Sequence, residues 1–270
     1  MVNKTLIPGR RRSTLVDLFC FALLCGGLVL MSIAGVENTG YNWQWYQIPK
    51  YLYTIDNNGW NAGPLLKGLL ITLQISAISL VFSFIIGLTT AIFRLSNSPV
   101  AVGLARLYLE VSRNTPLLIQ IFFIYFVLGP VLGLERLPAA ILALSLFEGA
   151  YASEILRAGI LAVPREQKEA AYSIGLSPYA TYRHIILPQA VRTVLPPLTS
   201  QMVSLIKDSA LVSTIAIYDL TMAAQAIIAE TYLTFEIWFT VAAMYLTVSL
   251  IVSLLAAYLE RRLKIPATSH

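Results

Sequence analysis

The sequence predicts an all-α membrane protein, a polytopic helical bundle of about six spans with both termini in the cytoplasm. Hydrophobic residues make up 57% of the 270 residues and charged residues only 12%, whereas a soluble domain carries about 25% charged residues. The mean hydropathy of +0.71 excludes an ordinary soluble enzyme and a disordered chain. The two cysteines, Cys20 and Cys25, share one apolar run, which excludes a disulfide scaffold.

Six stretches are long and apolar enough to be spans, because a spanning helix needs about 20 predominantly apolar residues. They are residues 18–36, 68–93, 115–134, 137–161, 193–218 and 237–258. The fourth stretch carries Glu148, Glu154 and Arg157, and the fifth carries Lys207 and Asp208. The first stretch follows a basic start and could be a signal peptide, but its apolar core exceeds the roughly 7–15 residues usual for one. We therefore expect a retained signal anchor.

The Lys and Arg residues orient these spans. With the N-terminus in the cytoplasm, fifteen of the 19 lie inside, three lie outside and Lys207 lies within a span, as the positive-inside rule requires. The net charge of +5 therefore reflects topology and gives no reason to expect nucleic-acid binding. The amphipathic segment 99–112 is expected to lie along the inner face before the third span.

An aromatic-rich loop follows the first span on the outer side. Its rings are Tyr41, Trp43, Trp45, Tyr46, Tyr51, Tyr53 and Trp60. Such rings prefer the headgroup layer, so an anchor on the outer surface is favoured over a substrate-binding role.

The longest inner connection, residues 162–192, has the signals of a helix–turn–helix. Pro164 suits a first helical turn, and Gly175 suits the left-handed residue that closes a helix. Ser177 and Pro178 then start a second helix, which Pro188 is expected to stop. Two alternatives stay open on these grounds: the loop docks into a groove on a partner protein, or it packs on its own bundle.

This loop resembles the E-A-A-x3-G-x9-I-x-L-P signature of bacterial ABC importer permeases. Every position of the signature is filled, by Glu169, Ala170, Ala171, Gly175, Ile185, Leu187 and Pro188. Residues 113–120, 148–160, 195–197 and 205–211 resemble the branch of this family that takes up polar amino acids of the histidine, glutamine and glutamate-aspartate type. The resemblance covers about residues 64–264. It divides the chain into an N-terminal span and outer loop (1–63), a transmembrane core (64–264) and a tail (265–270).

The resemblance implies a type I ABC importer transmembrane domain in the bacterial plasma (inner) membrane. Two permeases, identical or related, would enclose the pathway, and the loop 162–192 would dock onto a cytoplasmic ABC ATPase dimer. A periplasmic or surface-tethered binding protein would deliver a polar amino acid, with a lean towards glutamate/aspartate or general L-amino acids. The N-terminal span departs from the family, whose members often have five spans.

No catalytic or metal site is indicated in this chain. The sequence lacks the G-x-x-x-x-G-K-[ST] phosphate loop, so ATP and Mg²⁺ are expected on the partner ATPase. The two histidines, His184 and His270, lie in the loop and at the C-terminus. A secondary carrier or channel that needs no ATPase remains the alternative, and an intramembrane enzyme would need a nucleophile–base or metal constellation that is not visible.

The charges inside the spans suggest where a substrate passes, because a charge in hydrocarbon should face a cavity or a partner. Glu148 lies about 16 Å from the outer end of its span and Lys207 about 21 Å from the inner end of the next, so both reach similar depths. We hypothesise that Glu148, Lys207 and Asp208 border the path of a zwitterionic amino acid. The competing reading is a structural Glu148–Lys207 pair. Glu154 and Arg157, three residues apart, are expected to form a helical salt bridge, with gating as the less favoured role.

Overall fold

The computed structural model describes residues 16, 18–24, 26, 27, 35, 41–56 and 59–263, with side chains described as far as 258. The chain divides into two units, Met1–Trp45 and Tyr46–His270. In the first unit, residues 18–24 are helical, within the predicted first span. The remainder of that span, the basic residues before it and the tail 265–270 lie outside the described residues, apart from single positions.

Short elements precede the first long helix. They are η1 (Trp45–Gln47), α2 (Pro49–Leu52), and the strands β1 (Tyr53–Asp56) and β2 (Gly59–Ala62), which pair as an antiparallel hairpin. Ile48 is buried with Leu65 in an apolar cluster that also includes residues of α11 and α12, which fastens the α2 segment to the bundle. Trp60 remains 64% exposed. The surface-anchor role of the aromatic residues stays a prediction.

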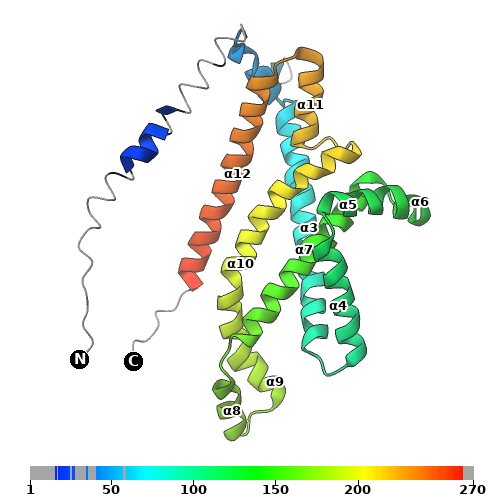
Figure 1. The fold of residues 1–270 in the computed structure, drawn as a ribbon, viewed down its shortest axis with the longest axis vertical. Coiled ribbons are helices and arrows are strands. Elements are labelled where there is room, and N and C mark those ends of the chain that lie inside the picture. Colours follow the sequence, from blue (N-terminus) through cyan, green and yellow to red (C-terminus); the bar gives the residue numbers. More distant parts are fainter. Residues whose placement is uncertain are drawn as a thin grey trace. The chain divides into compact units, whose positions relative to one another are not determined.

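Helices α3 (Pro64–Leu95) and α7 (Arg136–Leu161) form the centre of the second unit (Figure 1). Small residues allow their backbones to approach closely, as is usual between membrane helices. A Cβ on Gly87 would come within 2.8 Å of the Ala152 Cβ, so only glycine fits there. Serine hydroxyls at this helix contact donate hydrogen bonds to backbone carbonyl oxygens. The Ser145 hydroxyl, for example, donates to the Ile141 carbonyl oxygen at 2.6 Å.

The third predicted span is broken. Helix α4 (Pro99–Asn114) is followed by α5 (Leu117–Phe122), the π-helical turn η2 (Phe123–Leu128) and α6 (Gly129–Leu132). The two halves meet at an angle of 110°, because Thr115 and Pro116 are extended and Pro116 cannot continue the helical hydrogen bonds.

The expectation that segment 99–112 lies along the inner face is wrong. Helix α4 packs beside α3 and α7 instead (Figure 1). The hydroxyls of Tyr108 and Ser112 both donate to the carbonyl oxygen of Leu146, in the middle of α7. The amphipathic pattern of this segment therefore reflects a helix half-buried in the bundle rather than one lying on a lipid surface.

The inner loop contains α8 (Arg165–Ser173) and α9 (Pro178–Thr181), and a π-helical turn, η3 (Tyr182–Ile186), leads directly into α10 (Leu187–Asp208). The prediction that Pro188 ends a helix is therefore wrong. In a π turn, each N–H donates to the carbonyl oxygen five residues back, one residue further than in an α-helix. Pro188 lies in the first turn of α10, where a missing N–H costs little.

The last predicted spans correspond to α10 and α12 (Thr234–Leu263), joined by η4 (Ser209–Ile215) and α11 (Leu220–Thr231). Buried Asp219 caps α11 by accepting a hydrogen bond from the Met222 N–H at 2.9 Å. The Leu220 N–H donates to the Thr72 hydroxyl of α3 at 3.1 Å, which holds the start of α11 against α3.

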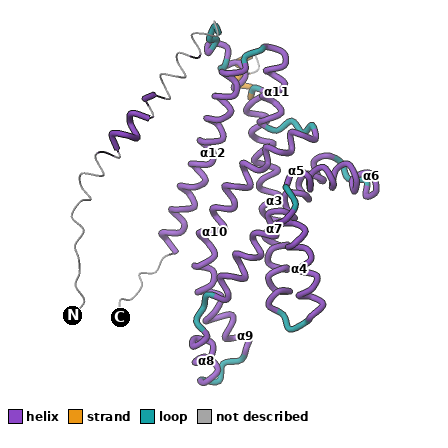
Figure 2. Tube along the Cα trace, in the orientation of Figure 1, coloured by secondary structure: helices purple, strands orange, loops and turns teal. Residues whose placement is uncertain are grey.

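By length and composition, three of the described helices can cross a membrane, namely α3, α7 and α12. The number rises to five if each bent pair, α4 with α5–α6 and α9–η4 with α11, counts as one span. Figure 2 shows that helix dominates the described part of the chain. The polytopic all-α fold is confirmed, with three to five candidate spans among the described residues of the core that the sequence placed at 64–264.

Candidate functional site

The inner loop has the geometry that its sequence predicts. Gly175 has φ +80°, the left-handed conformation that favours glycine. The Leu176 N–H donates to the Ala171 carbonyl oxygen at 3.1 Å, and the Gly175 N–H donates to that of Tyr172 at 3.0 Å. These two bonds form a Schellman motif. The Ser177 hydroxyl then accepts from the Ala180 N–H at 3.3 Å and caps the next helix.

The loop turns one set of side chains inwards and leaves the other exposed. Ala171 and Thr181 are buried where α8 meets α9 and η3. The Lys168 ammonium lies over the rings of Tyr172 and Tyr182, at 5.9 and 5.6 Å from their centroids. Ile174 is 77% exposed at the tip, in a loop that lies at the far end of the second unit from α11 (Figure 1).

The signature residues divide between these two environments. Ala171 is buried, and Ile185 is partly buried in η3. The remaining signature side chains are exposed, namely Glu169, Ala170, Leu187 and Pro188, as is the turn at Gly175. Small and apolar signature side chains are thus exposed on α8, at Ala170, and at the start of α10, at Leu187 and Pro188.

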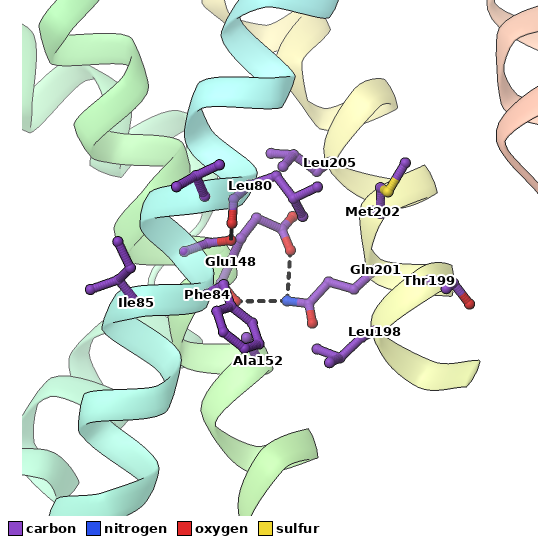
Figure 3. A pocket seen from close by; sticks show the side chains of 12 residues that line it. Leu80, Phe84, Ile85, Glu148, Ala152, Leu198, Thr199, Gln201, Met202 and Leu205 are labelled. Carbon is purple, nitrogen blue, oxygen red and sulfur yellow. Dashed lines mark hydrogen bonds between the residues drawn. The ribbon is translucent and has the colours of Figure 1, made fainter. Parts of the chain in front are cut away.

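A second candidate site surrounds Glu148 of α7, inside the bundle. Glu148 is 3% exposed, and it lies on α7 between α3 and α10 (Figure 3). The Gln201 amide of α10 donates to the Glu148 carboxylate at 2.8 Å and to the Glu148 backbone carbonyl oxygen at 2.7 Å. A cavity of about 380 Å³ on one side of this pair is lined by apolar residues of α3 and α10. The other amide atom, Gln201 Oε1, is buried and has no hydrogen-bond partner within the described part of the chain.

Asp208 and Lys207 lie in different pockets. Asp208 shares a second cavity of about 380 Å³ with Glu148, Gln201 and Tyr151, and we call it the acid pocket. The acid pocket is lined by Phe147, Glu148, Tyr151, Ile155, Ser200, Gln201, Ser204 and Asp208. Lys207 lines a neighbouring pocket between α10 and α12 instead. Among the described residues no ion pair joins Glu148 to Lys207, so the expected structural pair does not form.

Glu154, two turns further along α7, has more partners than its sequence neighbours suggest. Arg157 Nη2 lies 2.9 Å from Glu154 Oε2, which confirms the expected salt bridge. Arg94 Nη1, at the end of α3, lies 3.0 Å from the other carboxylate oxygen. Arg113 Nη1, at the end of α4, approaches the same oxygen at 3.8 Å. One carboxylate thus joins three helices.

The sequence interpretation missed Gln201, and it did not connect Arg94 or Arg113 with Glu154. By sequence, Arg94 and Arg113 lie between the second and third predicted spans and count among the fifteen cytoplasmic charges. A signal was available, because each lies within two residues of a helix end and Glu154 is the one acid of the inner half of α7. Among the described residues, no three His, Cys, Asp or Glu side chains gather closely enough to hold a metal ion.

Comparison with known proteins agrees with this architecture. Residues 83–265 match the family model described as "Binding-protein-dependent transport system inner membrane component". The glutamine transport system permease protein GlnP of Escherichia coli K12 is 39% identical over 210 residues, which cover 76% of this chain and 96% of that protein. The probable glutamine ABC transporter permease protein GlnP of Bacillus subtilis is 42% identical, over 73% of this chain and 93% of its own length. The L-cystine transport system permease protein TcyB of the same organism is 39% identical, over 74% and 87%.

A solved structure supports the same assignment. A crystal structure of an amino acid ABC transporter with histidines is 36% identical to this chain and superposes with a TM-score of 0.69, covering 74% of this chain and 94% of that one. A bacterial transporter for the polysaccharide alginate shares the fold alone, at 14% identity and a TM-score of 0.62. The sequence, the folded core and these relatives agree that the chain belongs to the family of inner membrane components of binding-protein-dependent transport systems, as an amino acid ABC permease.

Proposed function

We propose that this chain is the membrane-spanning subunit of an ATP-driven importer for a polar amino acid, in which it forms half of the translocation pathway. The observation that carries the proposal is the inner loop: a capped, closed helix pair that exposes the small or apolar side chains of Ala170, Ile174 and Tyr179. In this proposal the loop docks onto a cytoplasmic ABC ATPase, which binds the ATP and Mg²⁺. A second permease, identical or related, completes the pathway, and a binding protein delivers the substrate on the outer side of a bacterial plasma membrane.

The exposed surface of the loop supports docking over packing on its own bundle. Helix α8 makes its main contacts with α9 and η3, within the loop itself. Ile174 and Tyr179, 77% and 78% exposed, present apolar surface on either side of Gly175. Exposed apolar side chains on a rigid helical knob fit a groove on a partner. Membership in a transport family also leaves little support for the secondary carrier that the sequence allowed.

The docking proposal is tested by copurification. The tagged chain is produced together with its ABC ATPase and with the binding protein, and ATPase recovery is compared between the wild type and Ile174→Asp. A charge at the tip is expected to lower recovery at least tenfold, because an apolar anchor is lost and a carboxylate must be desolvated. Glu166→Lys, a charge change at an exposed position at the start of α8, is the control. Full recovery of ATPase with Ile174→Asp would contradict docking through this loop.

The acid pocket is the proposed substrate path. Glu148 and Asp208 offer carboxylates to an ammonium group, and Gln201 Oε1 is an unused acceptor beside them. Two of the relatives are named as glutamine permeases and one as a cystine permease, so we propose an uncharged polar amino acid of the glutamine type. The lean towards glutamate or aspartate stays a prediction of the sequence, and so does a role for Lys207.

Uptake assays on the assembled transporter test this path. Glu148→Gln is expected to raise the KM for L-glutamine about tenfold or more, because a charged hydrogen bond to the ammonium contributes about 1.5 kcal/mol or more. Lys207→Met removes a cation from the neighbouring pocket and decides whether that pocket also contacts substrate. Unchanged affinity and specificity in Glu148→Gln would remove the substrate role from the acid pocket. Competition by L-glutamate stronger than by L-glutamine would support the preference for glutamate or aspartate that the sequence predicts.

A further inference from the structure

Arg113 is the surplus cation of the Glu154 cluster. Each Glu154 oxygen already has a close partner, Arg94 at 3.0 Å and Arg157 at 2.9 Å. Arg113 lies 3.8 Å from Glu154, beyond hydrogen-bond distance. Three guanidinium groups around one carboxylate leave the cluster with two positive charges in excess, and Arg113 is the member whose charge is least compensated.

Arg113 is the most exposed of the three arginines around Glu154. Among the described residues its guanidinium has no hydrogen-bond acceptor, and its side chain is 48% exposed, against 19% for Arg94 and 29% for Arg157. A guanidinium carries five N–H donors in a rigid fork. Arg113 lies where α4 ends and the span breaks, next to the middle of α7. A cation at membrane depth is expected to face a cavity or an anion.

Tyr151 connects Arg113 to the acid pocket. The Arg113 guanidinium carbon lies 5.9 Å from the centroid of the Tyr151 ring. The same ring lines the acid pocket together with Glu148 and Asp208. The Tyr151 ring therefore lies near the Arg113 guanidinium and also lines the pocket that holds the two carboxylates. Charges of both signs beside one wall match the ammonium and carboxylate of a zwitterion.

We propose that Arg113 binds the α-carboxylate of the amino acid substrate while Glu148 and Asp208 receive its ammonium group. This inference rests on the proposed function, and it assigns to Arg113 the role that the sequence suggested for Lys207. Lys207 lines the pocket that faces α12, on the other side of Ser200 and Ser204 from the acid carboxylates. The guanidinium fork also suits a carboxylate better than an ammonium does, because it can donate two parallel hydrogen bonds.

Direct binding to the purified complex of this chain with its partner ATPase tests the inference, without the binding protein and its own selectivity. The probes are L-glutamine and L-glutamine α-amide, which differ in the carboxylate. The wild type is expected to prefer L-glutamine about ten- to a hundredfold, the value of a charged hydrogen-bonded contact. Arg113→Met is expected to lose that preference by weakening L-glutamine alone. Arg113→Lys, which keeps the charge and loses the fork, is expected to fall between the two.

Arg106→Met is the matched control, because Arg106 is an exposed arginine two turns earlier on the same helix. It is expected to keep the wild-type preference. The inference is overturned if Arg113→Met or Arg113→Lys keeps the full preference, or if both probes weaken equally, which would indicate a structural role. Binding that depends on anionic lipid and not on the probe's carboxylate would overturn it as well.

The outcome also separates this inference from the proposed function. A wild-type complex that binds none of the L-amino acids would overturn the proposed function and this inference together. A wild type that distinguishes the two probes, with an Arg113→Met variant that does so equally well, would overturn the role of Arg113 alone. Should Arg113→Met fail to assemble, Arg113→Lys decides the result.

Discussion

The inner loop and the buried polar region of α7 contain similar residue types but are built in different ways. In the loop, the hydrogen bonds that shape the turn and the cap join residues close in sequence, such as Leu176 to Ala171 and Ala180 to Ser177. Around α7, the contacts that hold the helices together join distant segments, such as Arg94 to Glu154 and Gln201 to Glu148. The loop is therefore a local structure that can be moved as a unit, whereas the polar region exists only when α3, α4, α7 and α10 are packed together.

This difference predicts where substitutions affect folding and where they affect coupling. A change in the polar region removes a contact between helices and should lower the stability of the whole bundle. A change in the loop should leave the bundle folded and alter only its communication with a partner. Three substitutions, ordered by expected effect, test the distinction.

Glu154→Gln is expected to have the largest effect on stability. The change leaves Arg94, Arg113 and Arg157 facing one another with no carboxylate among them. Removing one partner of a buried ion pair costs about 3–5 kcal/mol, and we expect about 2–3 kcal/mol because Glu154 is partly exposed. The thermal unfolding midpoint of the detergent-solubilised protein measures the loss. Glu166→Gln, in the exposed start of α8, is the control and should unfold like the wild type.

An unfolding midpoint for Glu154→Gln equal to that of the control would contradict the stabilising role of the polar region around α7. It would mean that the three arginines hold α3, α4 and α7 together through water or lipid and not through this carboxylate. Arg157→Gln, combined with Glu154→Gln, should recover part of the lost stability by removing one of the repelling charges.

Gly175→Val is expected to have an intermediate effect, confined to coupling. A left-handed conformation costs an L-residue about 1–2 kcal/mol, and a β-branched residue more. Since a Cβ at Gly175 meets no atom within 4 Å, the strain comes from φ +80° and not from a clash. ATP-dependent uptake and ATPase association are expected to fall about five- to thirtyfold, with membrane insertion unchanged.

Gly175→Asn is the matched control, because asparagine tolerates the left-handed region. It should retain most of the uptake. Normal ATP-coupled uptake by the valine variant would show that the turn at Gly175 is not needed for coupling. Loss of membrane insertion would show instead that the loop is part of the folding unit of the bundle.

Ser177→Ala is expected to have the smallest effect. It removes the side-chain cap of α9, which contributes about 1 kcal/mol to local helix stability. Amide hydrogen exchange is expected to accelerate in residues 179–181, with no change in α7 or α10. Ser173→Ala, on the same loop but with a hydroxyl that bonds back to Glu169 within α8, should not change exchange in α9. Faster exchange in α7 would contradict the independence of the loop.

Much of the fold could be predicted because its signals are local. Continuous apolar segments identified α3, α7 and α12, and glycine and the Ser-Pro pair identified the ends of α8 and the start of α9. Two local signals were misread. Pro188 did not end a helix because the π turn at η3 accommodates it, and the amphipathic α4 packs on α3 and α7 rather than on the inner surface. Proline and amphipathicity each permit two structures, and the neighbouring elements select one.

The sequence by itself determined the membrane class and the shape of the inner loop, since apolar length and capping residues act over a few neighbouring positions. The tertiary structure alone decided which charges meet. Lys207 and Asp208 are adjacent, yet successive residues on a helix point about 100° apart, so one faces α12 and the other shares a pocket with Glu148. Which of the two faced the acid pocket depended on how α10 packs between α7 and α12, and no local pattern carries that information.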